Sequence, residues 1–438
     1  MGPLEIGLLV LVGLLVLLAT GMPIAFALGA VSVGTLLMTD GSRSLLTLGE
    51  TFFGGLASFG LVSIPMFILM GAAVASSPAG KDLYAALDRW LNRIPGGLVL
   101  SNLGACSIFA ALSGSSPATC AAIGKMGIPE MRKRGYPADI ATGSIAAGGT
   151  LGILIPPSIT MIVYGIATET SIGRLFIAGI IPGILLTAMF MIWTVISCRM
   201  RGIGMADVTR RYSLKEKLEV LPRVLPFLAI IAGILFVLYG GVATPSEAAG
   251  AGALFCLLLV IVIYRMWQAG PIIRMFRDTL RESIMIMMII GASELFAYTL
   301  SSTFVTQSIA QWISELDVNR WVLMGIVNVF LLVAGFFLPP VAVILMTAPI
   351  LLPIITQAGF DPYWFAVILT INMEIGLITP PVGLNLYVIN GLVPDVPLST
   401  ILKGSLPYVL CMVLAMVILS IFPELVTGLP DLLMGKAV

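Results

Sequence analysis

The sequence predicts an all-α integral membrane protein, and composition is the first observation that indicates this class. Of the 438 residues, 59% are hydrophobic and only 10% are charged, with a mean hydropathy of +1.08. Soluble domains carry about 25% charged residues. A chain this apolar has more hydrophobic surface than one core can bury, so a bilayer must cover the remainder.

The second observation is an internal duplication. A shift of 224 residues matches glycines and prolines of the first half to those of the second without a gap, overlaying Gly152 on Gly376 and Pro156 on Pro380. Because Gly and Pro set backbone geometry, their repetition indicates two copies of one structural unit.

Each copy contains an apolar segment that is predicted to fold as a re-entrant helical hairpin, at 96–131 and at 320–356. The second arm of the first hairpin, 118–131, would span about 21 Å at 1.5 Å per residue, which is short of a hydrocarbon core of about 30 Å. The second arm of the other hairpin, 342–356, is similarly short. Each arm follows a tip rich in Ser, Gly or Pro, so we expect each hairpin to return to the side of the membrane from which it starts.

Each copy also contains a long apolar segment interrupted by two adjacent prolines, at 137–168 and at 360–391. Adjacent prolines remove two backbone donors and clash with the preceding turn. We therefore expect two broken helices with unwound centres. Unwound backbone at membrane depth is tolerated only where protein or a wet cavity satisfies its polar groups.

These elements divide the chain into a first repeat, 1–198, a cytoplasmic linker, 199–221, and a second repeat, 222–438. Each repeat has about five spans besides its hairpin, and an odd number of spans inverts the second copy. With the linker inside, nearly all Lys and Arg residues lie inside, as the positive-inside rule requires. Both termini are then predicted to face outward. The basic residues left outside are Arg43, Arg174, Arg320 and Lys436.

Hairpin tips and unwound centres offer carbonyl and hydroxyl oxygens, which suit a hard cation without its water. We predict one sodium site in each repeat. The predicted ligands are Ser113, Ser115, Gly149, Thr150 and Gly152 in the first and Gly335, Gly376, Thr379 and Gly383 in the second. The simpler alternatives are that the serines only cap a helix and that the threonines only bond carbonyls freed by the prolines.

The same tips and breaks are predicted to contact a substrate, because the N-terminal ends of half-helices attract anions. The candidates are Ser116, Pro117, Pro156, Pro339, Pro340, Pro380 and Asn385. No Lys or Arg is evident at depth as a partner for a substrate carboxylate. Half-helix ends and sodium would then supply the positive field.

Three acids could lie inside the membrane: Glu247, Glu294 and Glu374. A carboxylate at membrane depth is costly and usually functional. Glu374 lies closest to a break, and it could be a cation ligand, a proton carrier or a structural acceptor.

Several function classes are disfavoured. A net charge of +1 predicts no nucleic-acid partner. The chain has no His, and we found neither a metal-binding Glu-His motif nor a nucleophilic Ser with a base, so we do not expect an enzyme. A passive channel seldom needs two inverted hairpins.

The residues also suggest a family. The stretches Ser113–Thr119, Gly149–Pro157 and Glu374–Asn385 resemble the large membrane subunit of TRAP transporters, and the resemblance covers essentially the whole chain. It implies an elevator-type, sodium-driven importer of organic acids, such as C4-dicarboxylates or sialic acids, in the bacterial inner membrane, with periplasmic termini. It also implies a small four-helix membrane subunit and a periplasmic substrate-binding protein as partners. The alternative is a self-sufficient sodium symporter of dicarboxylates or citrate with a similar duplicated-hairpin plan.

Overall fold

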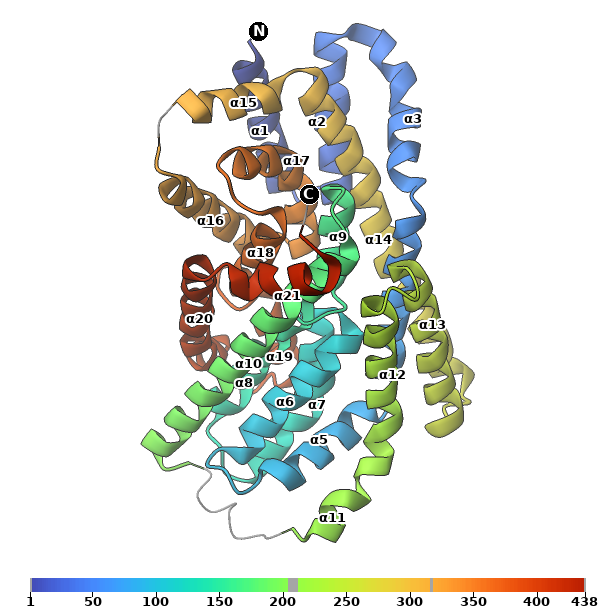
Figure 1. Cartoon of the computed structure of the whole chain (residues 1–438), viewed down its shortest axis with the longest axis vertical. Coiled ribbons are helices and arrows are strands. Elements are labelled where there is room, and N and C mark those ends of the chain that lie inside the picture. The colour runs from blue at the N-terminus through green and yellow to red at the C-terminus, as the bar shows by residue number, and fades with distance from the viewer. Residues whose placement is uncertain (1, 204–211, 316–317, 437–438) are drawn as a thin grey trace.

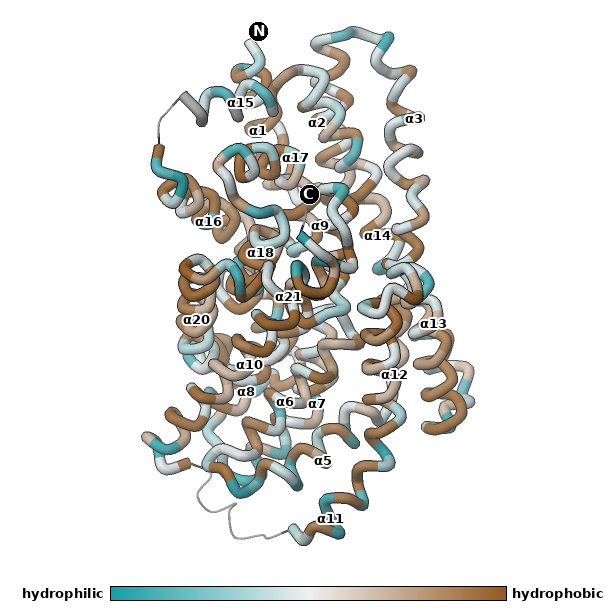
Figure 2. The backbone as a smooth tube through the Cα atoms, viewed as in Figure 1, coloured by the Kyte–Doolittle hydropathy of each residue, from teal (hydrophilic) through white to brown (hydrophobic). Residues whose placement is uncertain are grey.

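The computed structural model describes residues 2–203, 212–315 and 318–436, and every regular element within them is a helix (Figure 1). In these residues, eight helices are long and apolar enough to cross a membrane. The predicted all-α membrane class is confirmed. Figure 2 shows hydrophobic residues along most helices, with hydrophilic residues concentrated in connections and near the ends of the long axis.

The predicted first repeat starts with four helices, α1 (Pro3–Ala19), α2 (Ile24–Thr39), α3 (Leu45–Leu56) and α4 (Ser63–Ala75). The amphipathic α5 (Ala79–Leu91) leads to the first hairpin. The remaining helices are α6 (Gly97–Ser113), α7 (Ser116–Lys133), α8 (Ala138–Leu154), α9 (Ile159–Ala167) and α10 (Ile172–Arg201).

The linker contributes α11 (Leu214–Glu219), and its residues 204–211 lie outside the described part of the chain. The predicted second repeat also contains a hairpin followed by a broken helix and a long span, but among the described residues four helices precede its hairpin, against five in the first repeat, and a short helix follows its last span. Its helices are α12 (Leu221–Tyr239), α13 (Pro245–Leu258), α14 (Ala269–Ser302), α15 (Val305–Glu315), α16 (Arg320–Phe337), α17 (Pro340–Gln357), α18 (Pro362–Leu377), α19 (Leu384–Leu392), α20 (Leu398–Ile421) and α21 (Glu424–Met434). A short π-helical turn, Leu259–Ile263, continues α13. The repeat boundaries themselves stay a prediction.

Both hairpins are present, but their second arms are longer than predicted. Each of α7 and α17 has 18 residues, so neither is too short to span a membrane by length alone. The reason is local: Pro117 is the second residue of α7 and Pro340 the first residue of α17, and in the first turn of a helix a proline costs no hydrogen bond. Residues assigned to the tips therefore belong to the first helical turns.

Both helix breaks lie where the sequence predicts them. α8 ends at Leu154 and α9 begins at Ile159, while α18 ends at Leu377 and α19 begins at Leu384. The Pro-Pro bond in each break is cis. In Figure 1, α6 and α7 lie in the lower half and α16 and α17 in the upper half, so the hairpins approach the middle from opposite sides.

Candidate functional site

The two hairpin tips meet at one cavity of about 160 Å³. Four of the predicted substrate-contacting residues line it, and they come from both hairpins: Ser116, Pro117, Pro339 and Pro340. The opposite wall is formed by α14, through Glu282, Met285, Ile286 and Ile289. Segments more than 200 positions apart in sequence therefore share one small chamber.

The first tip packs directly on the first helix break. Gly114 has φ +56°, and a Cβ built there would lie 3.2 Å from the carbonyl oxygen of Pro157. A Cβ on Gly152 would lie 2.7 Å from the carbonyl oxygen of Ser115. Contact this close excludes a larger residue at Gly152 unless the backbone moves. Glycine at position 152 therefore allows the backbone of α8 to contact the backbone of the first hairpin tip.

Several buried oxygens gather at this first contact. The carbonyl oxygen of Ser115 accepts from the Thr119 hydroxyl at 2.9 Å and lies 3.4 Å from the Ser113 hydroxyl. The Ser116 hydroxyl lies 3.4 Å from the carbonyl oxygen of Thr150. All are neutral oxygens, and oxygen is the donor type of hard cations, so a sodium site at this contact stays a prediction. Thr119 was not among the predicted site residues, although it lies inside the motif that suggested the family.

The second tip packs on the second break in a similar way. A Cβ on Gly376 would lie 2.5 Å from the carbonyl oxygen of Gly335. The backbone N–H of Val382, in the unwound centre, donates to the carbonyl oxygen of Phe336 at 3.3 Å. The Thr379 hydroxyl donates to the carbonyl oxygen of Ile375, and Gly383, with φ +58°, is the N-cap of α19. The oxygens available here come mainly from the backbone.

Glu374 connects the two halves. Its carboxylate is fully buried and accepts from the Ser116 hydroxyl at 2.9 Å and 3.1 Å to its two oxygens. It therefore acts as a structural acceptor between α18 and the first turn of α7. Its roles as cation ligand or proton carrier stay hypotheses. Glu247 instead forms a capping box with Thr244 at the start of α13, and Glu294 is exposed on α14.

The remaining predicted substrate contacts do not line this cavity. Pro156 lines a separate apolar cavity of about 460 Å³ against α10, and Pro380 is exposed. Asn385 is buried, and its amide donates to the carbonyl oxygen of Ala146 at 3.3 Å.

Comparison with known proteins decides the family. Residues 11–425 match the family described as "Tripartite ATP-independent periplasmic transporter, DctM component". The chain belongs to the DctM family. It is accordingly a transporter permease and not an enzyme, and the predicted family is confirmed.

Relatives of this DctM-family chain carry different substrate names. The chain is 39% identical to the C4-dicarboxylate TRAP transporter large permease protein DctM of Pseudomonas aeruginosa, over 89% of this chain and 90% of that protein. It is 32% identical to the ectoine TRAP transporter large permease protein TeaC of Halomonas elongata, over 96% and 97%. Its fold is similar to that of the YdaH transporter of Alcanivorax borkumensis, with a TM-score of 0.63 at 18% identity, over 89% of this chain and 90% of that one.

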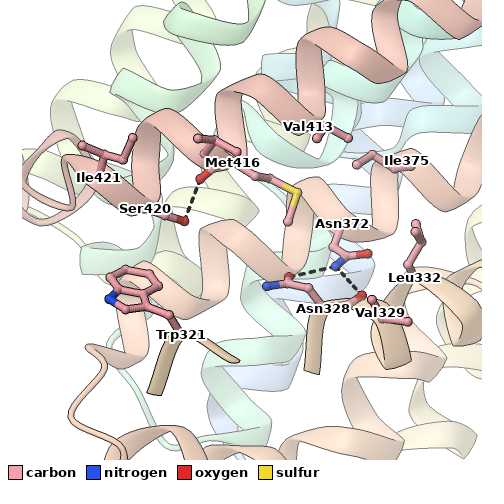
Figure 3. Close-up of a pocket in the computed structure, with 11 residues that line it drawn as sticks. Trp321, Asn328, Val329, Leu332, Asn372, Ile375, Val413, Met416, Ser420 and Ile421 are labelled. Carbon is pink, nitrogen blue, oxygen red and sulfur yellow. Dashed lines mark hydrogen bonds between the residues drawn. The ribbon is translucent and has the colours of Figure 1, made fainter. Parts of the chain in front are cut away.

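A larger cavity of this DctM-family chain, about 560 Å³, lies between α16, α18 and α20 (Figure 3). On its wall the Asn372 amide donates to the backbone oxygen and the side-chain oxygen of Asn328, each at 2.9 Å. The other lining residues are mostly apolar, and none is charged. Size alone does not make it a transport site, because neither hairpin tip nor either helix break contributes to it.

Proposed function

We propose that the chain is the large permease subunit of a sodium-coupled tripartite importer of organic acids. The observation that carries the proposal is the meeting of both hairpin tips at one small cavity, in a chain that belongs to the DctM family. A transporter needs a site that can be reached from either side in turn, and inverted repeats place such a site near the membrane midplane.

Sodium is the proposed coupling ion because the oxygens at both contacts are neutral. In the first half, Ser113, Ser115 and Thr150, with the carbonyls of Gly149 and Gly152, would hold one ion. In the second half the ligands would be Thr379 and the carbonyls of Gly335, Gly376 and Gly383. A bound sodium ion would supply positive charge next to a substrate carboxylate. The named residues position the ligand oxygens and hold each hairpin tip against the helix break of the same repeat.

The same geometry supports a proposed movement of elevator type. The tips and breaks pack on each other, whereas α14 faces them across the cavity. We propose that α14 belongs to a scaffold and that the hairpins with their broken helices move along it. The membrane is the bacterial inner membrane, with both termini periplasmic, as the distribution of basic residues favours.

The partners are a small membrane subunit and a periplasmic substrate-binding protein. The family description, a component of a tripartite periplasmic transporter, supports this assignment. The substrate would be a C4-dicarboxylate, a sialic-acid-like carboxylate or a related organic acid, delivered by the binding protein.

Reconstitution tests the proposal. The purified chain in liposomes with a sodium gradient should take up little acid alone. Addition of the small subunit and substrate-loaded binding protein should restore uptake that saturates with binding-protein concentration. Robust uptake of free substrate by the chain alone would reject the tripartite proposal and favour the self-sufficient symporter.

A further inference from the structure

The second hairpin contains a carbonyl group that its own helix leaves without a regular backbone partner. In an α-helix the carbonyl oxygen of Leu345 would accept from the backbone N–H four residues later. That position is Pro349, inside α17, and proline has no N–H. Leu345 is buried, and buried backbone oxygens are nearly always hydrogen-bonded. A donor for this carbonyl therefore has to come from another element.

The donor comes from α14. The hydroxyl of Ser293 donates to the carbonyl oxygen of Leu345 across the contact between α14 and α17, and both residues are buried. The other buried hydroxyls of α14 bond carbonyls of α14 itself; they belong to Thr279, Ser283 and Thr299. Ser293 is thus the buried hydroxyl of this helix that is used to bind a hairpin.

The first hairpin contacts the neighbouring helix α4 through its backbone. A Cβ built on Gly71 of α4 would lie 2.8 Å from the carbonyl oxygen of Ser113 and 2.9 Å from its Cα atom, at the hairpin tip. Only glycine allows this approach without a shift of the backbone. α4 packs against α13 and α14, so we place these three helices together in the proposed scaffold. Each hairpin therefore has one close contact with that scaffold.

We propose that Ser293 and Gly71 are positioning residues that hold the two hairpins in this conformation of the transport cycle. The inference rests on the proposed function, in which the hairpins move along α14. When the second hairpin moves, the carbonyl of Leu345 loses the Ser293 hydroxyl, and Pro349 prevents it from pairing within α17. The bond therefore favours the present position of the hairpin over other positions along the scaffold.

Double electron–electron resonance between two spin labels measures these positions. The labels are attached to cysteines at Thr356, exposed near the end of α17, and at Leu254, exposed on α13, in a chain without its native cysteines. The full-length chain is measured in lipid nanodiscs in sodium buffer. Movement predicts two distances, of which one corresponds to the present structure.

Two substitutions should depopulate the present distance. Ser293→Ala removes the hydroxyl, and should lower the ratio of the present distance to the other about fivefold or more. Gly71→Ala adds a methyl group that fits only when the tip of the first hairpin moves away, and should lower the same ratio. Gel filtration checks that each variant is folded.

Two further variants assign the effect to the bond. Ser283→Ala removes a buried hydroxyl that bonds the carbonyl of Thr279 within α14, and should leave the ratio within about twofold of the wild-type value. Pro349→Ala supplies the missing N–H, so the Leu345 carbonyl is paired in both positions. Adding Ser293→Ala to this variant should change the ratio by less than about twofold. Pro349→Ala alone should lower the ratio, which keeps the test available if Ser293→Ala does not fold.

The inference would be overturned by an unchanged ratio in folded Ser293→Ala or Gly71→Ala, by an equal change in Ser283→Ala, or by the same effect of Ser293→Ala with and without Pro349. A single distance in the wild type and in every variant would also overturn it. Failure of the proposed function is separate. A lowered ratio in Ser293→Ala without sodium-driven uptake by the complete system would support the positioning role and reject the importer, whereas uptake with an unchanged ratio would do the opposite.

Discussion

Substitution of Gly376 by Ala tests whether the backbone contact between the second hairpin and the second break builds a cation site. A Cβ at Gly376 would lie 2.5 Å from the carbonyl oxygen of Gly335 and 2.7 Å from its carbonyl carbon. Ordinary contact begins at 3.4 Å, so α16 and α18 must separate by about 0.9 Å. Neither neighbour is a flexible side chain that could move aside.

Forced separation of this kind typically costs about 1–3 kcal/mol. If the cost falls on the ion-bound state, the sodium concentration for half-maximal uptake rises roughly 5- to 150-fold. The assay is a sodium titration of uptake by the complete reconstituted system, with gel filtration to establish that the variant is folded.

Gly325→Ala is the matched control. Gly325 lies on the same helix, α16, and is exposed, and a Cβ built there would meet no atom of a neighbouring element within 4 Å. Its replacement should leave the sodium titration unchanged and favour the helix slightly, by about 1 kcal/mol or less. An unchanged half-saturating sodium concentration in folded Gly376→Ala, or an equal shift in both variants, would refute the reasoning.

Three further predictions follow from the same contacts. Thr150→Val and Thr379→Val keep side-chain shape but remove an oxygen, so each should raise the sodium concentration needed for half-maximal uptake without lowering expression; unaltered sodium activation in both would exclude hydroxyl ligands. Glu374→Leu should lower the melting temperature more than Glu374→Gln, because Leu cannot accept from the buried Ser116 hydroxyl, which then keeps only the carbonyl oxygen of Thr150 at 3.4 Å; the loss costs about 1–3 kcal/mol. Equal melting temperatures would argue against the link between the halves. Single cysteines at Ser115 and Pro340, in a chain without its native cysteines, should change labelling in opposite directions when sodium and substrate are added, whereas constant labelling of both would indicate a static pore.

The fold was largely predictable because Gly and Pro carry backbone information locally. The prolines at 156–157 and 380–381 place both helix breaks, and their repetition at one spacing indicates the duplication. The hairpin arms were underestimated for a related reason. Pro117 and Pro340 suggest irregular tips, but proline is tolerated in the first turn of a helix, so helix geometry begins earlier than the pattern indicates.

The site was only partly predictable because its chemistry depends on which helix faces meet. The contact between Glu374 and Ser116 joins residues 258 positions apart, and no periodic pattern in the sequence indicates it. Glu282 belongs to a helix with acids and arginines on several sides, so the sequence does not reveal which of them faces the hairpin tips. The glycines at 152 and 376 were found because close backbone approach leaves a signature in residue type.

Exchange of the driving gradient tests the central claim, sodium coupling, most directly. The complete system, with the small subunit and loaded binding protein, is reconstituted in liposomes, and substrate uptake is compared under an inward sodium gradient and under an inward proton gradient in sodium-free buffer. Sodium coupling predicts concentrative uptake under the first condition and none under the second. Full uptake in sodium-free buffer would contradict it.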